Sequence, residues 1–84
     1  MAPNDRMSFV TGPVLTANSA ITLDSSSAET RDAVASFLHR LAQGGDPQAQ
    51  ADRSSGHFIS RVGQARVVWK REGDEITVIS IFIP

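Results

Sequence analysis

The stretch "SRVGQARVVWKREGDEITVIS", Ser60 to Ser80, decides the fold that we predict for this chain. Over residues 65–70, apolar and polar side chains alternate with the two-residue period of a strand that buries one face. The segment "REGDE" is typical of a hairpin connection, because Gly73-Asp74 supplies residues that tolerate positive φ. The text that follows, "ITVISIFI", is almost entirely apolar, as expected of a strand covered on both faces. The stretch therefore predicts two antiparallel strands.

An amphipathic helix is predicted upstream, over about residues 27–43. Its apolar face repeats with helical spacing at Thr30, Val34, Phe37 and Leu41. Ser26 and Glu29 fit a capping box that would begin the helix, and Gly44-Gly45 would end it. Since one helix covers only one face of a sheet, we expect the apolar last strand to leave surface for a partner or a dimer mate.

The remaining segments give weaker signals. Residues 57–62 alternate like a strand, and so do residues 20–24, where Ile21 and Leu23 flank Thr22. We expect residues 8–15 to form an extended arm or edge hairpin, residues 46–56 to form a loop or at most one weak helical turn, and residues 1–7 to be frayed. The predicted fold class is α+β: an antiparallel sheet of three to five strands with one main N-terminal helix packed on one face, in a single small domain spanning residues 1–84.

Composition limits the classes of function. The 84 residues include no cysteine, which excludes a disulfide framework and a zinc–thiolate site and fits a cytoplasmic protein. No apolar run is long enough to span a membrane, and the N-terminus does not resemble a signal peptide. The formal charge of −1 argues against strong non-specific binding of nucleic acid by the whole surface, but it leaves a local basic patch open.

The opening stretch carries four cations: Arg61, Arg66, Lys70 and Arg71. Arg66 and Lys70 would project from one face of a strand, with Arg61 near the preceding turn. Cations that converge on a cleft could stabilise the negative charge of a phosphoryl-transfer transition state. They could equally cover the solvated face of a sheet and pair across strands with the acidic residues Glu72, Asp74 and Glu75. Spacing alone favours the second interpretation.

The chain has two histidines and one tryptophan to consider as functional residues. His57 begins a predicted strand four residues before Arg61, so it is a candidate general acid or base for ribose 2′-OH chemistry, or else a half-exposed strand-start residue. His39 is expected to be solvated on the helix. Trp69 is expected to anchor the core rather than to stack on a base. No group of residues has metal-ligand spacing, and we expect no metal and no cofactor.

The segment "RVGQARVVW", Arg61–Trp69, has two arginines five residues apart, a nearby glycine, two β-branched residues and an aromatic residue, and "REGDEITVISIF" follows it. With these features the chain resembles the RelE/ParE superfamily of small toxins from type II toxin–antitoxin modules, over about residues 20–82. The resemblance implies an antitoxin as protein partner. In the ribosome-dependent nuclease branch of that superfamily, it implies metal-free cleavage of ribosome-bound mRNA.

Carried over by position, the resemblance implicates Arg61 and Arg66 as catalytic residues, with Arg61 the better match to the catalytic strand arginine of the family. His57 is a stand-in acid or base that matches no motif position. The chain departs from the family pattern in having Ala65 where an aromatic residue is usual, no tyrosine, and no cation after Arg71. The resemblance therefore supports the fold more strongly than the catalysis.

Two functions follow as hypotheses. The first is the toxin of a toxin–antitoxin pair, acting as a metal-free endoribonuclease or as a gyrase inhibitor. The second is a non-catalytic interaction module, an inactive relative that binds a protein partner or forms a homodimer through its apolar C-terminal strand. Neither hypothesis involves a membrane.

Overall fold

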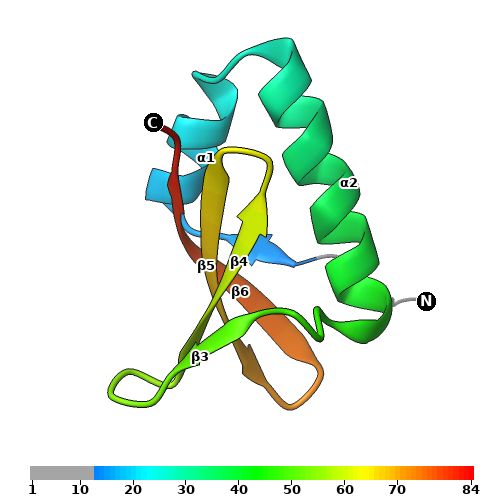
Figure 1. Ribbon diagram of the computed structural model, residues 1–84, viewed down its shortest axis with the longest axis vertical. Coiled ribbons are helices and arrows are strands. Elements are labelled where there is room, and N and C mark those ends of the chain that lie inside the picture. The colour runs from blue at the N-terminus through cyan, green and yellow to red at the C-terminus, as the bar shows by residue number, and fades with distance from the viewer. Residues whose placement is uncertain (1–12) are drawn as a thin grey trace, which may run out of the picture.

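The computed structural model describes residues 13–84 (Figure 1). Its elements are β2 (Val14–Leu15), α1 (Ala17–Asp24), α2 (Ala28–Gly44), β3 (Gln50–Asp52), β4 (His57–Val62), β5 (Ala65–Glu72) and β6 (Glu75–Phe82). The predicted fraying of residues 1–7, and the part of the predicted arm that precedes residue 13, lie outside the described residues.

One five-stranded sheet has the strand order β2-β6-β5-β4-β3. The pairs β3–β4, β4–β5 and β5–β6 are antiparallel, whereas the two-residue strand β2 runs parallel to β6. Two helices pack on this sheet (Figure 1). The predicted α+β class with an antiparallel sheet and a main helix is therefore confirmed, and the structure adds a parallel edge strand and a second, shorter helix.

The core lies between α2 and one face of the sheet. The helix contributes Val34, Phe37, Leu38 and Leu41, and the sheet contributes Ala65, Val67, Trp69, Ile76, Val78 and Ile81. These residues confirm the apolar face predicted for the helix and the alternation predicted for residues 65–70. Burial of each large aliphatic or aromatic side chain stabilises the fold by roughly 1.5–3 kcal/mol.

Trp69 anchors this core, as predicted. The side chain is 4% exposed, and its ring stacks on Phe58 with a centroid separation of 4.6 Å. Its indole Nε1–H donates a hydrogen bond of 2.9 Å to the buried Ser60 hydroxyl, so both buried polar groups are satisfied. The aromatic pair therefore belongs to the core and is not available to stack on a ligand.

The helix α2 begins one residue later than the predicted capping box. Ser27, not Ser26, is the N-cap residue, and its hydroxyl accepts a hydrogen bond of 3.2 Å from the Thr30 N–H. The Ser26 hydroxyl instead donates to the Leu23 carbonyl at the end of α1. Because three serines stand in a row, the sequence alone does not show which of them is the N-cap residue. Gly45, with a φ of 78°, ends the helix as expected.

The strand predicted over residues 20–24 is wrong, because these residues belong to helix α1. The prediction rested on a three-residue alternation, which is too short to establish a period. The Thr16 hydroxyl caps this helix by accepting from the Ser19 N–H, and the Thr16 N–H bonds the Val78 carbonyl of β6. Strand β6, which is distant in sequence, thus holds the residue that caps α1, and a local sequence pattern could not show this.

The loop predicted over residues 46–56 contains the short edge strand β3. Its residues Gln50, Ala51 and Asp52 pair with Ile59, Phe58 and His57 of β4. All three are exposed, so the strand rests on backbone pairing and gives no hydrophobic signal in the sequence.

A β-bulge interrupts the pairing of β5 with β6. Val68 lies opposite Ser80, whereas the next residue, Trp69, lies opposite Val78, so Ile79 is the extra residue.

The bulge changes which side chains of β6 face the helices. Ile76 and Val78 face the helices before the bulge, and Ile81 does so after it. The adjacent Phe82 consequently projects from the opposite face, where it is 59% exposed. Together with the 36% exposed Ile83, this ring is the apolar surface that the last strand was expected to leave.

Candidate functional site

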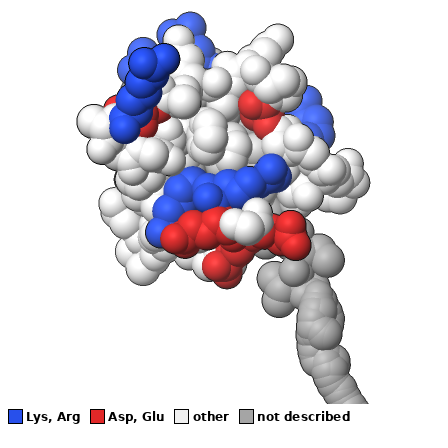
Figure 2. Space-filling view, turned by 90° about the horizontal axis from the view of Figure 1, so that it is seen from below, with Lys and Arg blue, Asp and Glu red and all other residues white. Residues whose placement is uncertain are grey.

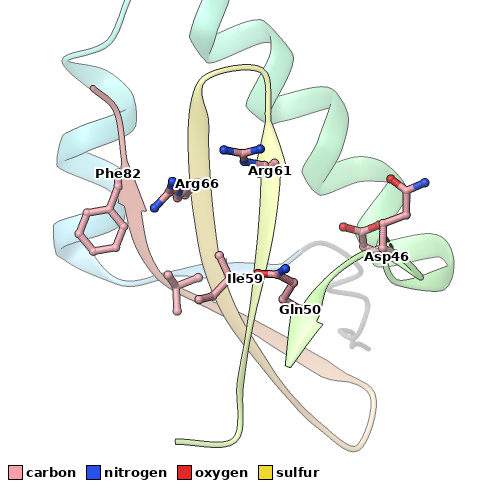
Figure 3. Close-up of a pocket in the computed structure, with 8 residues that line it drawn as sticks. Asp46, Gln50, Ile59, Arg61, Arg66 and Phe82 are labelled. Carbon is pink, nitrogen blue, oxygen red and sulfur yellow. Dashed lines mark hydrogen bonds between the residues drawn. The ribbon is translucent and has the colours of Figure 1, made fainter. Parts of the chain in front are cut away.

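The face of the sheet opposite the helices carries a row of three side chains across three strands. Arg61 on β4 lies opposite Arg66 on β5, and Arg66 lies opposite Phe82 on β6. Opposite residues of an antiparallel pair have Cβ atoms about 4.5–5.5 Å apart, so the two guanidinium groups and the aromatic ring share one site. Figure 3 shows the two arginines side by side in the middle of this face, with the Phe82 ring next to Arg66.

A groove of about 600 Å³ surrounds this row. Ile59 and Val68, which are opposite each other on β4 and β5, form its half-buried apolar floor. Its far wall is polar and comes from the segment between α2 and β4: Asp46, Gln48 and Gln50. Figure 3 shows Asp46 and Gln50 on the side of Arg61 that is away from Phe82. The groove thus has an aromatic rim, two cations at its centre and an amide and carboxylate wall.

The electrostatics of the arginine pair favour an anionic ligand. Like charges directly opposite each other on a sheet are destabilising. Within residues 13–84, neither Arg61 nor Arg66 has a carboxylate within ion-pairing distance, and the ion pair recorded there joins Lys70 to Glu72 at 3.3 Å. Asp46 lines the same groove, but its Oδ1 accepts a hydrogen bond of 3.1 Å from the Gln48 N–H. A phosphate between the two guanidinium groups would relieve their repulsion.

The other two cations of the opening stretch have different surroundings. Lys70 pairs with Glu72, so its charge is compensated on the solvated face, but the two residues lie on the same strand and not on neighbouring strands as the interpretation of a solvated sheet face expected. Arg71 lies over the end of α2, where its Nη2 is 3.7 Å from the position that a Cβ on Gly45 would occupy. No basic residue occurs in the last turn of α2, so Arg71 supplies the cation that the helix dipole favours there.

Charges near the β5–β6 turn are mixed in sign. Figure 2, seen from the end at the bottom of Figure 1, shows a band of cationic side chains directly beside a band of acidic ones. The turn segment itself reads "KREGDE", Lys70 to Glu75. Cations at this end are therefore compensated by their neighbours, whereas Arg61 and Arg66 have no such acidic neighbour within ion-pairing distance among residues 13–84.

The structure places the predicted acid or base His57 away from the arginine pair. His57 begins β4, is half-buried, and lies four residues along the strand from Arg61, which corresponds to roughly 13 Å. It is opposite Asp52 of β3 and does not line the groove. His39 is exposed on α2, with its Nε2 atom 3.2 Å from the Gln43 amide nitrogen. The fold thus brings together Arg61 and Arg66 but not His57.

A second polar cluster stabilises the turn that joins β3 to β4. The Ser54 hydroxyl and N–H, together with the Ser55 hydroxyl, donate hydrogen bonds of 2.8–3.1 Å to the Asp52 carboxylate. The bond from the Ser54 hydroxyl is the main cause that lowers the pKa of Asp52 from its usual value of 3.8. This carboxylate is fully exposed and lies outside the groove, so we assign it to the turn.

Sequence reasoning missed the aromatic rim and the polar wall of the groove. Phe82 reaches it only because of the bulge at Ile79, which shifts the alternation of β6. Asp46 and Gln50 reach it because the segment after α2 folds back along β4. The Asp46-Pro47 pair did signal a turn, but nothing in the sequence indicated which element that turn would face.

The chemistry of the groove is that of anion recognition. Two guanidinium groups can hold the non-bridging oxygens of a phosphodiester, and the Phe82 ring offers a surface for an adjacent base. Among the lining residues, Asp46 has the one carboxylate, which is the candidate proton acceptor. Residues 13–84 contain no group of three or more side chains arranged to hold a metal ion.

Comparisons with known proteins concern the fold. No family model matches the sequence, and no curated protein matches it. The structure is similar to a chain of the crystal structure of the toxin–antitoxin complex RelBE2 from Mycobacterium tuberculosis, with a TM-score of 0.76 and 17% sequence identity. The match covers 89% of this chain and 100% of that chain. The fold expected from the resemblance to the RelE/ParE superfamily is thereby confirmed. Within the described region, no helix has the length and apolar character needed to cross a membrane.

Proposed function

We propose that this chain is the toxin of a toxin–antitoxin pair and that its groove binds a single-stranded RNA backbone. The observation that carries the proposal is the cross-strand pair Arg61–Arg66, which has no acidic partner among residues 13–84 and lies at the centre of a groove. The shared fold with a chain of a toxin–antitoxin complex supports the assignment. The partner that follows from it is an antitoxin protein, and the compartment is the cytoplasm.

The reaction proposed for the groove is metal-free endonucleolytic cleavage of ribosome-bound mRNA. The ribose 2′-OH gives its proton to a base and attacks the adjacent phosphorus. The P–O5′ bond breaks, leaving a 2′,3′-cyclic phosphate and a 5′-hydroxyl that takes up a proton. Arg61 and Arg66 would stabilise the negative charge that develops on the phosphorus oxygens, which is often the largest single catalytic contribution.

Two residues are candidates for the proton transfer. Asp46 lines the groove beside Arg61 and is the nearer one (Figure 3). His57 carries an imidazole, the side chain that most often transfers protons in catalysis, but it could act only on a substrate that extends along β4, because roughly 13 Å of strand separates it from Arg61. Measuring RNA cleavage after substitution of Asp46 and, separately, of His57 decides between a reaction inside the groove and one beside it.

Phe82 completes the proposed RNA site. Its ring is 59% exposed and lies next to Arg66, so a base that follows the bound phosphate can stack on it. Stacking of a base on an aromatic side chain contributes about 1–3 kcal/mol and tolerates any base. This contribution suits a protein whose net charge of −1 provides little non-specific attraction for RNA.

Expression in bacterial cells tests the proposal. The wild type should arrest growth, and Arg66→Ala should abolish the arrest while its thermal unfolding stays cooperative. Lys70→Ala is the matched control. It also removes a cation from β5, but this cation already pairs with Glu72, so the variant should still arrest growth. Continued growth arrest by the Arg66→Ala protein would overturn the assignment. Arrest accompanied by a DNA-damage response, with translation intact, would identify a gyrase inhibitor instead.

A second candidate is a non-catalytic interaction module. Four exposed apolar side chains favour it: Val14, Ile21, Phe82 and Ile83. It predicts no growth arrest, no cleavage of RNA, and association with a protein partner or with a second copy. Arg66→Ala would leave that association unchanged, whereas Phe82→Ala would weaken it.

A further inference from the structure

The bulge in β6 has a specific set of partners outside the sheet. The Val78 carbonyl accepts hydrogen bonds of 3.1 Å from the Thr16 N–H and from the Ser19 hydroxyl. The next carbonyl, of Ile79, accepts a bond of 2.9 Å from the Thr16 hydroxyl. In a regular strand, successive carbonyls point to opposite edges, whereas both of these point toward Thr16. The extra residue of the bulge is left out of the ladder, and Thr16 supplies the partner that it lacks.

Thr16 has a second role at the same point. Its hydroxyl oxygen accepts a bond of 3.3 Å from the Ser19 N–H and so caps α1. Ser19 is fully buried under this cap. The single hydroxyl of Thr16 therefore ties the start of α1 to the irregular position of β6.

The bulge decides which side chains of β6 face the groove. If Ile79 stayed in the chain but took its place in a regular ladder, unbroken alternation after Val78 would turn Ser80 and Phe82 toward the helices and Ile81 toward the groove. With it, Ile81 is 5% exposed in the core, and Phe82 lies opposite Arg66 on the open face. A one-residue shift thus exchanges an aliphatic side chain for an aromatic one beside the arginine pair.

We infer that Thr16 is a positioning residue for the groove: its hydroxyl fixes the bulge at Ile79, and the bulge holds the Phe82 ring beside Arg66. Thr16 lies outside the groove and acts on it through Ile79 and Phe82. The effect on the ring position stands on the geometry alone, whereas the effect on RNA binding rests on the proposed function.

Two substitutions separate the hydroxyl from the shape of the side chain. Thr16→Val keeps the branched shape and removes the donor, and Thr16→Ser keeps the donor. Nuclear Overhauser effects between the Phe82 ring and the Arg66 side chain should persist in Thr16→Ser and weaken or vanish in Thr16→Val. Ser19→Ala is the control: it removes the Ser19 hydroxyl, and with it the bonds to the Val78 carbonyl and to the Thr16 hydroxyl, but leaves the Thr16 hydroxyl free to donate to the Ile79 carbonyl, so these signals should remain. Unchanged signals in Thr16→Val would overturn the inference.

A deletion provides a second test, and its first step does not involve Thr16→Val. Removing Ile79 makes β6 regular, and its alternation then keeps Ile81 in the core and Phe82 beside Arg66 without any help from Thr16. The deletion variant should retain the Phe82–Arg66 signals, and adding Thr16→Val to it should not change them. Loss of the signals on adding Thr16→Val would show that the hydroxyl acts by another route.

Binding to a short single-stranded RNA completes the experiment. Thr16→Val should weaken binding about tenfold, which is the order of one lost stacking contact. In a Phe82→Ala background it should have no further effect on binding, although it should still lower the melting temperature. An equal loss of binding in both backgrounds would reduce Thr16 to a structural role and contradict the inference. If the wild type binds no RNA, the proposed function fails, while the ring-position measurements still decide the role of Thr16.

Discussion

Arg61 and Arg66 lie directly opposite each other on β4 and β5, at the centre of a groove and without an acidic partner among the described residues. Such a pair is unfavourable for the free protein and favourable for binding an anion. The arrangement therefore predicts a conflict between stability and binding at these two positions.

Replacing one of these arginines should raise stability and lower RNA affinity. Arg66→Gln removes the repulsion, so the free energy of unfolding should rise by about 0.2–1 kcal/mol. The slope of log K against log salt concentration should become shallower by about 0.7 for single-stranded RNA, because one phosphate contact is lost. Denaturant unfolding, together with RNA binding at several salt concentrations, checks both changes. Lys70→Gln should leave the salt slope unchanged, and a shallower slope there would contradict the placement of the site.

The proton acceptor should be identified by its effect on cleavage rather than on binding. If the reaction takes place in the groove, Asp46→Asn should reduce the cleavage rate by roughly 10²–10⁴ while binding persists. His57→Gln should then change neither rate nor affinity, since it does not line the groove. Single-turnover cleavage of a labelled RNA measures the rates. A loss of cleavage in His57→Gln but not in Asp46→Asn would identify His57 as the proton acceptor and place the reaction further along β4.

Arg71 should contribute to stability and not to binding. Arg71→Ala removes the cation over the end of α2, so the free energy of unfolding should fall by about 0.3–1 kcal/mol. Arg71→Lys should recover part of the loss, and the difference between wild type and Arg71→Ala should shrink at high salt, because the interaction is electrostatic. Thermal unfolding at low and high salt measures this. A loss that does not depend on salt would point to packing of the arginine stem instead.

The core between α2 and the sheet should be sensitive to truncation. Leu41 is fully buried, so Leu41→Ala should cost about 2–5 kcal/mol of unfolding free energy. Ile21 is 66% exposed on α1, and Ile21→Ala should stay within about 0.5 kcal/mol of the wild type. Urea unfolding of the two variants provides the comparison. A large loss for Ile21→Ala would show that α1 buries this side chain against a further surface.

Asp52 should titrate below its usual pKa of 3.8, because Ser54 and Ser55 donate to its carboxylate. Because the pKa is lower in the folded state, the hydrogen bonds to Asp52 contribute to the free energy of unfolding in full only above the pKa of this carboxyl group in the unfolded chain, about 3.9. This contribution is lost as the pH falls through the folded value. An NMR titration of the Asp52 carboxyl carbon measures the pKa, and Ser54→Ala should raise it toward 3.8. No change in Ser54→Ala would contradict the assigned cause.

Local patterns were sufficient wherever one element buries one face. Helix α2 was predictable because its apolar residues repeat with helical spacing and two glycines follow. The hairpins of β4, β5 and β6 were predictable because the alternation of β4 and β5, the apolar run of β6 and the glycines of the turns agree. Arg61 and Arg66 could be selected as site residues, since both lie in the segment that carries the family resemblance.

Elements held mainly by distant partners could not be predicted from the sequence. Helix α1 was read as a strand because Thr16 caps it from a position fixed by β6, more than sixty residues away. All three residues of strand β3 are exposed, so the strand has no apolar pattern in the sequence and is defined by its backbone pairing with β4. His57 is only four residues from Arg61 in the sequence, but the extended backbone of β4 separates the two side chains.

By itself, the sequence determined the α+β class, the main helix and the hairpins, because short-range periodicity and turn chemistry specify them; it singled out Arg61 and Arg66 only through the family resemblance. Only the tertiary structure decided that Phe82 lies beside Arg66 and that Asp46 closes the groove. The physical reason is that a strand's alternation is fixed locally only while its ladder is regular. At Ile79 the ladder breaks, and the hydroxyl of Thr16, from the other end of the chain, bonds the carbonyl that the ladder leaves out.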